Sequence, residues 1–178
     1  MTELIELLRE KSVRFGTFTL ASGKTSDFYV DARQTTLHAI GSVRVAEAVL
    51  NVLHDDIVGV GGLTLGADPI ACATSAISSL KGRPIHAFLI RKEAKGHGTG
   101  KRVEGMANLS PGDKVAIVED TTTTGGSLLQ AVAQAEAVGL VVTQCITIVD
   151  RQEGASERIA AAGYTLTALV TRDMLEAT

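Results

Sequence analysis

Runs of apolar, mostly β-branched residues alternate along the chain with segments in which apolar residues recur every three or four positions. The runs predict five strands: IVGVGG (57–62), IHAFLI (85–90), KVAIVED (114–120), VVTQCITIV (141–149) and YTLTALV (164–170). The helical spacing predicts four helices: 2–11, 38–54, 71–80 and LLQAVAQAEAV (128–138). Continuous apolar strands separated by helices predict a doubly wound α/β fold, with a parallel sheet covered by helices on both faces.

The ends of the 128–138 helix carry recognisable signals. Ser127 and Gln130 have the S-x-x-Q spacing of a capping box, and Gly139 is expected to end the helix. In parallel sheets of this kind, ligands bind at the carboxyl ends of the strands, where the strand order switches. We therefore expect the chemistry in the loops that follow residues 62, 90, 120 and 149.

Composition indicates one globular domain over residues 1–178, because no linker, repeat or low-complexity segment divides the chain. A net charge of −3 and an aromatic fraction of 3% without Trp argue against a nucleic-acid-binding protein. The longest uncharged run, 121–135, is shorter than the roughly 20 apolar residues that span a bilayer. The acidic start MTELIELLRE is unlike a signal peptide. We expect no membrane association.

Neither cysteine nor histidine indicates a metal site held by the protein. Cys72 and Cys145 lie far apart in apolar surroundings, which predicts two buried thiols in a reducing cytoplasm. His38, His54 and His86 have no second ligand at metal-binding spacing. We therefore expect these residues to have structural roles.

The loop after the 114–120 strand contains the most specific pattern in the chain. Glu119 and Asp120 are followed by TTTTGGS (121–127), which opens a helix. Backbone N–H groups at a helix start, with glycines that allow close approach, form an anion cradle. Two carboxylates beside such a cradle need another target, either sugar hydroxyls or a metal. The alternative is a polar turn with incidental acids.

A second pattern is the basic, glycine-rich segment RKEAKGHGTGKR (91–102). It holds five of the 17 Lys and Arg residues of the chain, together with His97 and three glycines. A solvated charged loop is one interpretation. A mobile lid that closes over a polyanion is the other, because glycines favour movement and cations favour phosphate.

The first pattern resembles the 5-phosphoribosyl-1-pyrophosphate (PRPP) motif of type I phosphoribosyltransferases, and RKEAKGHGTG resembles the catalytic loop of the orotate phosphoribosyltransferase family. Two further segments resemble that family in the same order: FGTFTLASGKTSDFYVDAR (15–33), its N-terminal hood, and DRQE (150–153). The resemblance covers most of the chain. It implies the type I phosphoribosyltransferase fold, with a small hood at 1–36 and a mobile catalytic loop at 91–102.

The resemblance also implies residue roles. Glu119 and Asp120 would hold the ribose hydroxyls, Lys95 and His97 would act on the leaving pyrophosphate, and all four are candidate catalytic residues. Thr123 and Arg151 would bind orotate. The positions that match PRPP-binding positions are Arg91, Lys92, Lys95, His97, Glu119, Asp120, Thr121, Thr122, Thr123, Thr124, Gly125, Gly126 and Ser127.

The implied reaction is transfer of the 5-phosphoribosyl group from PRPP to orotate, giving orotidine 5′-monophosphate and pyrophosphate in de novo pyrimidine biosynthesis. Mg²⁺ would be required and held mainly by substrate and water. The family resemblance implies a homodimer whose catalytic loops are shared in trans. Two alternatives remain: a phosphoribosyltransferase for another base, and a non-catalytic PRPP-sensing regulator on the same fold.

The chain departs from many bacterial members at two lysine positions. Ala21 replaces a hood lysine, and Thr64-Leu65 replaces a Tyr-Lys pair in the loop that faces pyrophosphate. Lys24 is a candidate substitute, and the 61–69 loop is expected to act through backbone amides. Asp31 and Arg33 either help to close the hood or form an exposed salt bridge.

Overall fold

A six-stranded sheet forms the centre of the molecule, in a computed structural model that describes residues 1–19, 25–92 and 102–177. The strand order is β5-β4-β3-β6-β7-β8. All neighbours are parallel except β4 and β5. The strands are β3 (Gly59–Leu63), β4 (His86–Ile90), β5 (Val103–Glu104), β6 (Lys114–Thr122), β7 (Val141–Asp150) and β8 (Leu166–Thr171). The predicted doubly wound sheet is confirmed, with β5 as an antiparallel edge strand.

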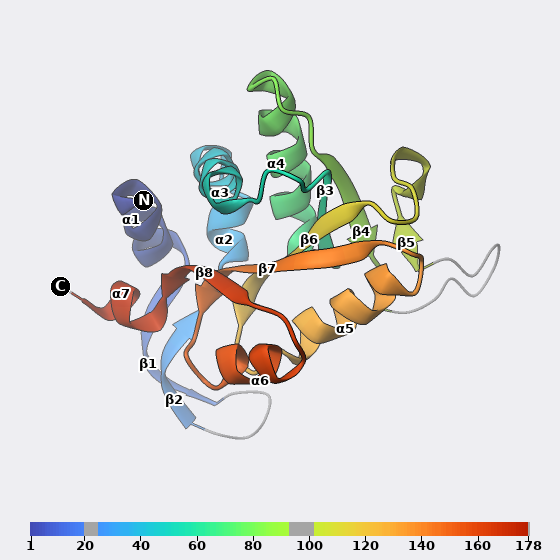
Figure 1. Ribbon diagram of the computed structural model, residues 1–178. Coiled ribbons are helices and arrows are strands. Elements are labelled where there is room, and N and C mark those ends of the chain that lie inside the picture. The colour runs from blue at the N-terminus through green and yellow to red at the C-terminus, as the bar shows by residue number, and fades with distance from the viewer. Residues whose placement is uncertain (20–24, 93–101, 178) are drawn as a thin grey trace.

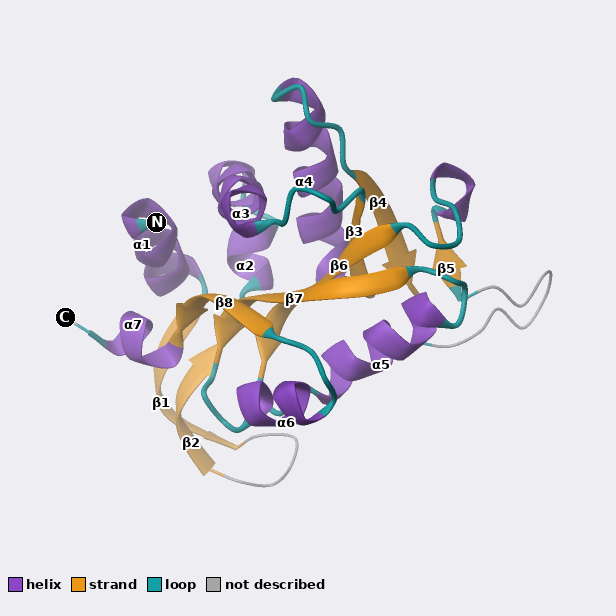
Figure 2. Ribbon diagram, in the orientation of Figure 1, coloured by secondary structure: helices purple, strands orange, loops and turns teal. Residues whose placement is uncertain are grey.

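Helices cover both faces of the sheet, because successive residues of a buried strand point to opposite sides. Ala116 and Val118 of β6 pack with α3 (Ala39–Val52) and α4 (Ala67–Leu80). Val115 and Ile117 pack on the other face with α5 (Gly126–Glu136) and α6 (Ala155–Ala161). Figures 1 and 2 show these two helical layers with the sheet between them. The β6 strand therefore has apolar contacts on both sides until it reaches Glu119.

The N-terminal segment forms a separate subdomain beside the sheet. It consists of α1 (Thr2–Lys11), an antiparallel hairpin of β1 (Val13–Thr19) and β2 (Thr25–Val30), and the short helix α2 (Arg33–Thr36). The Arg9 side chain of α1 donates to the Leu175 carbonyl oxygen of α7 (Arg172–Glu176) at 3.1 Å. The N-terminal segment is thus joined to the C-terminal helix, and the hairpin lies at the carboxyl ends of the strands (Figure 1).

Two details of the predicted helices are corrected. The capping box at Ser127 and Gln130 is wrong: α5 begins at Gly126, and its N-cap, Gly125, has a left-handed φ of 74° and no side-chain cap. Gly125 allows the chain to turn two residues earlier than a Ser127 cap would. The helix predicted at 71–80 begins at Ala67, since Pro69 is accommodated in the first turn, where no backbone N–H is needed. Gly139 follows the end of α5 with a φ of 88°, as predicted.

The two cysteines differ. Cys145 is buried in β7, and burial raises its pKa to about 12. The prediction that Cys72 is buried is wrong: it lies on the exposed face of α4, whose inward positions include Ile70, Ala71 and Thr74. Within the part of the chain that the structure describes, no helix combines the length and the apolar composition needed to cross a membrane.

Candidate active site

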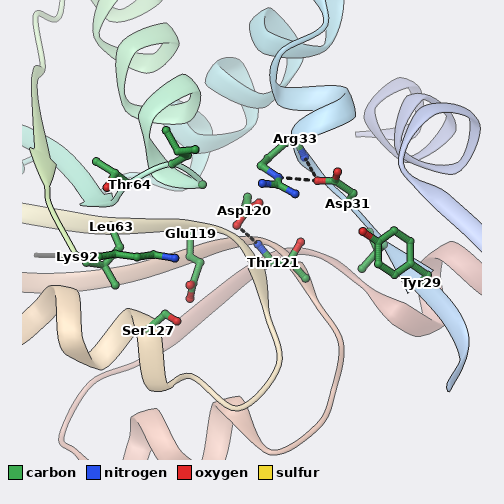
Figure 3. Close-up of a pocket in the computed structure, with 13 residues that line it drawn as sticks. Tyr29, Asp31, Arg33, Leu63, Thr64, Lys92, Glu119, Asp120, Thr121 and Ser127 are labelled. Carbon is green, nitrogen blue, oxygen red and sulfur yellow. Dashed lines mark hydrogen bonds and ion pairs between the residues drawn. The ribbon is translucent and has the colours of Figure 1, made fainter. Parts of the chain in front are cut away.

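The site lies where the strand order switches. The chain places β4 on one side of β3 and β6 on the other, so the loops that follow β3 and β6 separate at the carboxyl edge of the sheet. A cavity of about 410 Å³ occupies this position (Figure 3). Its walls come from the end of the hood (29–33), the β3 loop (63–66), Lys92 and the end of β6 with Ser127.

The acid pair at the end of β6 lines this cavity. Burial raises the pKa of Glu119 to about 7, and the neighbouring charge of Asp120 adds to the rise. Burial also raises the pKa of Asp120, although the Thr121 backbone N–H donates to its Oδ1 at 2.9 Å. Each carboxyl group is half-buried and accepts few hydrogen bonds from the protein, so its oxygens can accept hydrogen bonds from the hydroxyl groups of a polyol ligand.

A smaller cavity of about 190 Å³ adjoins the first at the start of α5 and shares Glu119, Thr121 and Ser127 with it. Its remaining lining residues are Thr123, Thr124, Gly125 and Gly126. A Cβ on Gly125 would lie 3.1 Å from the Ile159 side chain, so this turn has little room for a larger residue. The backbone turn therefore exposes the helix N-terminus to the cavity, which is the arrangement of an anion cradle.

Thr122 differs from the other loop residues that the sequence singled out. It is 1% exposed and lines neither cavity. Its Oγ1 donates to Glu119 Oε2 at 3.4 Å. Alternation along β6 turns Thr122 inward while Thr121 faces the ligand space. Thr122 therefore contacts Glu119 from the buried side of the strand and does not face the ligand space.

The β3 loop closes one side of the cavity without a cation. Leu65 is 70% exposed, and the Thr64–Leu65 peptide bond is cis. A Cβ on Gly66 would lie 2.5 Å from Asp120 Oδ1, so the loop backbone packs directly on this carboxyl group. Any larger residue at position 66 would displace the Asp120 side chain.

The hood contributes Asp31 and Arg33 to the wall of the larger cavity, two residues for which the sequence left two roles open. Arg33 Nε donates to Asp31 Oδ1 at 2.8 Å, with exposed side-chain fractions of 47% and 17%. The salt bridge is therefore present, and both residues also line the cavity. Figure 3 shows the Arg33 guanidinium next to Asp120. The D-x-R spacing of Asp31 and Arg33 was the only sequence signal for this salt bridge, and it could not show that Arg33 lies next to Asp120.

The basic segment contributes unevenly. Lys92 lines the cavity, whereas Arg91 pairs with Glu104 of β5 at 2.9 Å and lines neither cavity. Lys95 and His97 lie outside the described residues, as do Ala21 and Lys24. The position of the predicted catalytic residues of this loop thus stays a prediction.

The two predicted orotate-binding residues follow neighbouring strands. Thr123 lines the smaller cavity. Arg151 is 7% exposed and lines neither cavity, but its backbone N–H donates to the Thr122 carbonyl oxygen at 3.0 Å. Its Nη2 lies 2.8 Å from Glu153 Oε1, while its Nε has no hydrogen-bond partner among the described residues. The structure therefore places Arg151 beside the cradle, with a buried donor to spare.

Comparisons with known proteins agree with this geometry. No protein-family model matches the chain. It is 50% identical over 162 residues to the orotate phosphoribosyltransferase of Corynebacterium glutamicum, covering 90% of this chain and 85% of the relative. It is 44% identical over 169 residues to that of Nostoc sp., with 95% and 82% covered. A crystal structure of Mycobacterium tuberculosis orotate phosphoribosyltransferase in complex with PRPP superposes with a TM-score of 0.80 at 39% identity, covering 98% of each chain.

These relatives match at least 90% of this chain. Identities of 39–50% over that length indicate the family as well as the fold, which many unrelated functions can share. The chain belongs to the orotate phosphoribosyltransferase family, whose members are pentosyl-transferring glycosyltransferases.

Proposed function

We propose that this enzyme transfers the 5-phosphoribosyl group of PRPP to orotate with the residues assembled at the switch point, as a step of pyrimidine biosynthesis. The observation that carries this assignment is the position of Glu119 and Asp120 between an anion cradle and a larger cavity. PRPP has the matching order of groups, with a ribose between a 5-phosphate and a diphosphate. The 5-phosphate would occupy the cradle, and the diphosphate would extend into the larger cavity.

The acid pair would hold the ribose and respond to charge at the anomeric carbon. Ribose hydroxyls donate hydrogen bonds, and ionised carboxylates are the strongest acceptors available. As the diphosphate leaves, positive charge develops on the ribose, as in glycoside chemistry. Carboxylates fixed at the end of β6 would stabilise this charge without reorganising.

The diphosphate needs cations as its negative charge grows on leaving. Lys92 lines the cavity, and its charge partly opposes the burial that raises the pKa of Glu119, which supports a position near the reacting centre. Lys95 and His97 would join it when the 91–102 loop closes over PRPP. Closure excludes water and strengthens each cation–phosphate contact.

The donor set fits Mg²⁺ held largely by substrate. The described residues contain no group of three or more His, Cys, Asp or Glu side chains that could hold a metal ion by themselves. We expect the diphosphate oxygens, the ribose hydroxyls and water to hold most of the Mg²⁺, because this ion prefers substrate phosphates to sites built by the protein alone. When bound, Mg²⁺ would neutralise part of the diphosphate charge.

Orotate would be recognised through its carboxylate. The buried Arg151 has an Nε donor without a partner among the described residues, and an unpaired buried donor favours an anionic ligand. Thr123 lies on the adjoining loop, within the smaller cavity. We assign these two residues to the base-binding part of the site.

A magnesium-dependent assay of the purified protein with PRPP and a panel of bases tests the reaction and its specificity. Orotate should be turned over far faster than hypoxanthine, adenine or uracil. Equal rates for another base would identify a phosphoribosyltransferase of different specificity. PRPP binding without turnover of any base would favour a regulator.

We also propose a cytoplasmic homodimer that shares its catalytic loops. Support comes from an apolar face beside the site, where Leu37, Ile40 and Leu65 are 71%, 53% and 70% exposed. A third cavity, which has a volume of about 560 Å³ and lies outside the acid-pair site, is lined by Leu37, Leu65 and Cys72 on the same face. A second copy of the chain is the occupant we propose for this face, because symmetric dimers bury the same apolar patch from both subunits.

Mixing two inactive variants tests the shared loop. Asp120→Asn and Lys95→Ala should each be inactive alone. After free subunit exchange at equal amounts, half of the dimers are heterodimers, and each has one intact site if the loop acts in trans. About a quarter of all sites should then regain activity. No recovery, with exchange proven by native mass spectrometry, would mean that each loop serves its own chain.

A further inference from the structure

The β3 loop brings no charged side chain to the larger cavity: its lining residues there are Leu63, Thr64, Leu65 and Gly66. Leu65 is 70% exposed, so this position has room for a longer side chain. A diphosphate in this cavity would face the 64–66 loop, and backbone amides alone leave most of its charge uncompensated. A cation for this side of the diphosphate therefore has to come from another wall of the cavity.

Arg33 is held in a fixed orientation at the opposite wall. Asp31 Oδ1 accepts from Arg33 Nε at 2.8 Å and from the Arg33 backbone N–H at 3.3 Å, while Gln34 Nε2 donates to Asp31 Oδ2 at 3.2 Å. Burial alone would raise the pKa of Asp31, but these hydrogen bonds lower it, so the carboxylate stays ionised and keeps its hold. The anchor uses only Nε of the guanidinium.

The rest of the guanidinium faces the ligand space. Among the described residues, the Arg33 side chain has only the hydrogen bond to Asp31. Its terminal NH₂ groups lie beside Asp120 in Figure 3, and Gly66 packs on that same carboxyl group from the β3 loop. Arg33 and Leu65 also line the adjoining third cavity, of about 560 Å³. The guanidinium and the 64–66 loop are therefore two walls of one space.

Arg33 and Lys92 lie on different sides of the acid pair. Figure 3 shows Lys92 extending toward Glu119, whereas Arg33 is next to Asp120. They are the only cations that line the cavity among the described residues. A group with two or three negative charges bound here would thus lie between two cations. On the Arg33 side, the planar guanidinium offers two parallel N–H donors.

We propose that Arg33 binds the diphosphate of PRPP and supplies the positive charge that the β3 loop lacks at Leu65. This inference rests on the proposed function, because it assumes that the diphosphate occupies the larger cavity. Two parallel N–H groups on one guanidinium match two phosphate oxygens, which a lysine ammonium cannot do. Asp31 acts as the positioning residue, because it orients Arg33 before the ligand arrives. An exposed ion pair by itself would contribute little.

Binding measurements on matched variants test the assignment. Titration calorimetry with Mg²⁺ would give the affinities for PRPP, inorganic pyrophosphate and orotidine 5′-monophosphate, of which only the first two carry a diphosphate. Arg33→Gln should weaken both diphosphate ligands by about 10- to 100-fold and change the nucleotide by less than about threefold. Arg83→Gln removes a half-exposed arginine outside the site, which pairs with Asp55 at 3.6 Å and donates to the His54 carbonyl oxygen, and should change none of them.

Two more variants keep the test independent of folding defects. Arg33→Lys retains the charge without the fork and should fall between the wild type and Arg33→Gln. Adding Leu65→Lys to Arg33→Gln should restore much of the pyrophosphate affinity, because it returns a cation to the loop. Recovery by a second substitution could not come from a misfolded chain.

Three results would overturn the inference, and they separate its failure from that of the proposed function. Unchanged pyrophosphate and PRPP affinities in Arg33→Gln would mean that Arg33 does not bind the diphosphate and that its only role is the salt bridge with Asp31. Equal losses for all three ligands would assign Arg33 to the ribose grip. If the wild type binds neither PRPP nor pyrophosphate, the proposed function itself fails.

Discussion

The two anion-binding regions of the site are built in opposite ways. The cradle at the start of α5 is one continuous turn, and its lining residues are Glu119 and uncharged Thr, Gly and Ser side chains. The larger cavity instead has Lys92 and Arg33 from distant parts of the sequence. In the first region, backbone N–H groups bind the anion and the fold fixes their direction. In the second, exposed side-chain cations bind it, and salt or a single substitution can remove them.

This contrast fits the proposed chemistry. A 5-phosphate stays bound throughout the reaction, so a rigid cradle is sufficient for it. A diphosphate must be held, stabilised as it leaves, and then released. Exposed side-chain cations serve those steps better than a buried backbone turn, because water and salt compete for their charge when the product leaves.

The largest expected effect comes from breaking the backbone turn. Gly125→Ala forces a residue with φ near 74° to carry a Cβ 3.1 Å from Ile159. Such strain costs about 1–3 kcal/mol of stability, and displacement of the cradle should lower kcat/KM for PRPP by on the order of 100-fold. Thermal unfolding and steady-state kinetics measure the two effects.

Gly112→Ala is the matched control. Gly112 has a φ of 93°, but a Cβ there meets nothing within 4 Å. It should share the backbone strain and a comparable loss of stability while keeping the wild-type kcat/KM. If both variants lost the same activity, the cradle would have no special role.

Removing a side-chain cation should have the next largest effect and should depend on salt. Lys92→Gln is expected to raise KM for PRPP about tenfold at low ionic strength, the equivalent of one charge-assisted contact. The difference from wild type should shrink as salt rises, because the exposed lysine is screened. A salt-independent difference would place Lys92 in a buried role instead.

The acid pair lies between the two regions and should make PRPP use depend on pH. Burial raises the pKa of Glu119 to about 7, so the carboxylate that accepts ribose hydroxyls forms mainly above that pH. kcat/KM for PRPP should therefore rise about tenfold from pH 6 to pH 8. Glu119→Gln should flatten this rise, and an unchanged profile would assign it to another group.

The same pKa shift predicts the opposite trend for the stability of the ligand-free protein. A carboxyl group whose folded-state pKa is raised binds its proton more tightly in the folded state. Its contribution to the free energy of unfolding is present below the usual value of 4.5 and is lost as pH rises to about 7. Chemical denaturation across this range, with Glu119→Gln for comparison, measures the loss.

A hydroxyl in the cradle should matter least. Ser127 lines both cavities and is exposed, and its proposed contact is an uncharged hydrogen bond to phosphate. Ser127→Ala should raise KM for PRPP only about threefold, with no change in salt dependence. A loss as large as that of Lys92→Gln would mean that side chains, rather than the backbone, dominate the cradle.

The sequence determined the regular part of the fold and the residues that act as one local unit. Apolar periodicity placed the five parallel strands within about two residues, because each contributes apolar side chains to the layers packed on the sheet. Except for the buried Thr122, the residues from Glu119 to Ser127 lie together at one site as predicted, because strand end, turn and helix start are consecutive in the chain. Errors arose where the pattern is ambiguous: the cap at Ser127 was wrong because the left-handed Gly125 begins the helix first.

Tertiary structure decided which distant residues meet. Arg91 and Lys92 are neighbours in sequence, yet Arg91 pairs with Glu104 while Lys92 reaches the cavity. Cys72 is exposed because the other faces of α4 pack inward. Arg33 and Asp120 are 87 positions apart, and only the packing of the hood against the sheet edge places one beside the other. Local pattern carries no information about such pairs, because their proximity depends on how whole layers pack together.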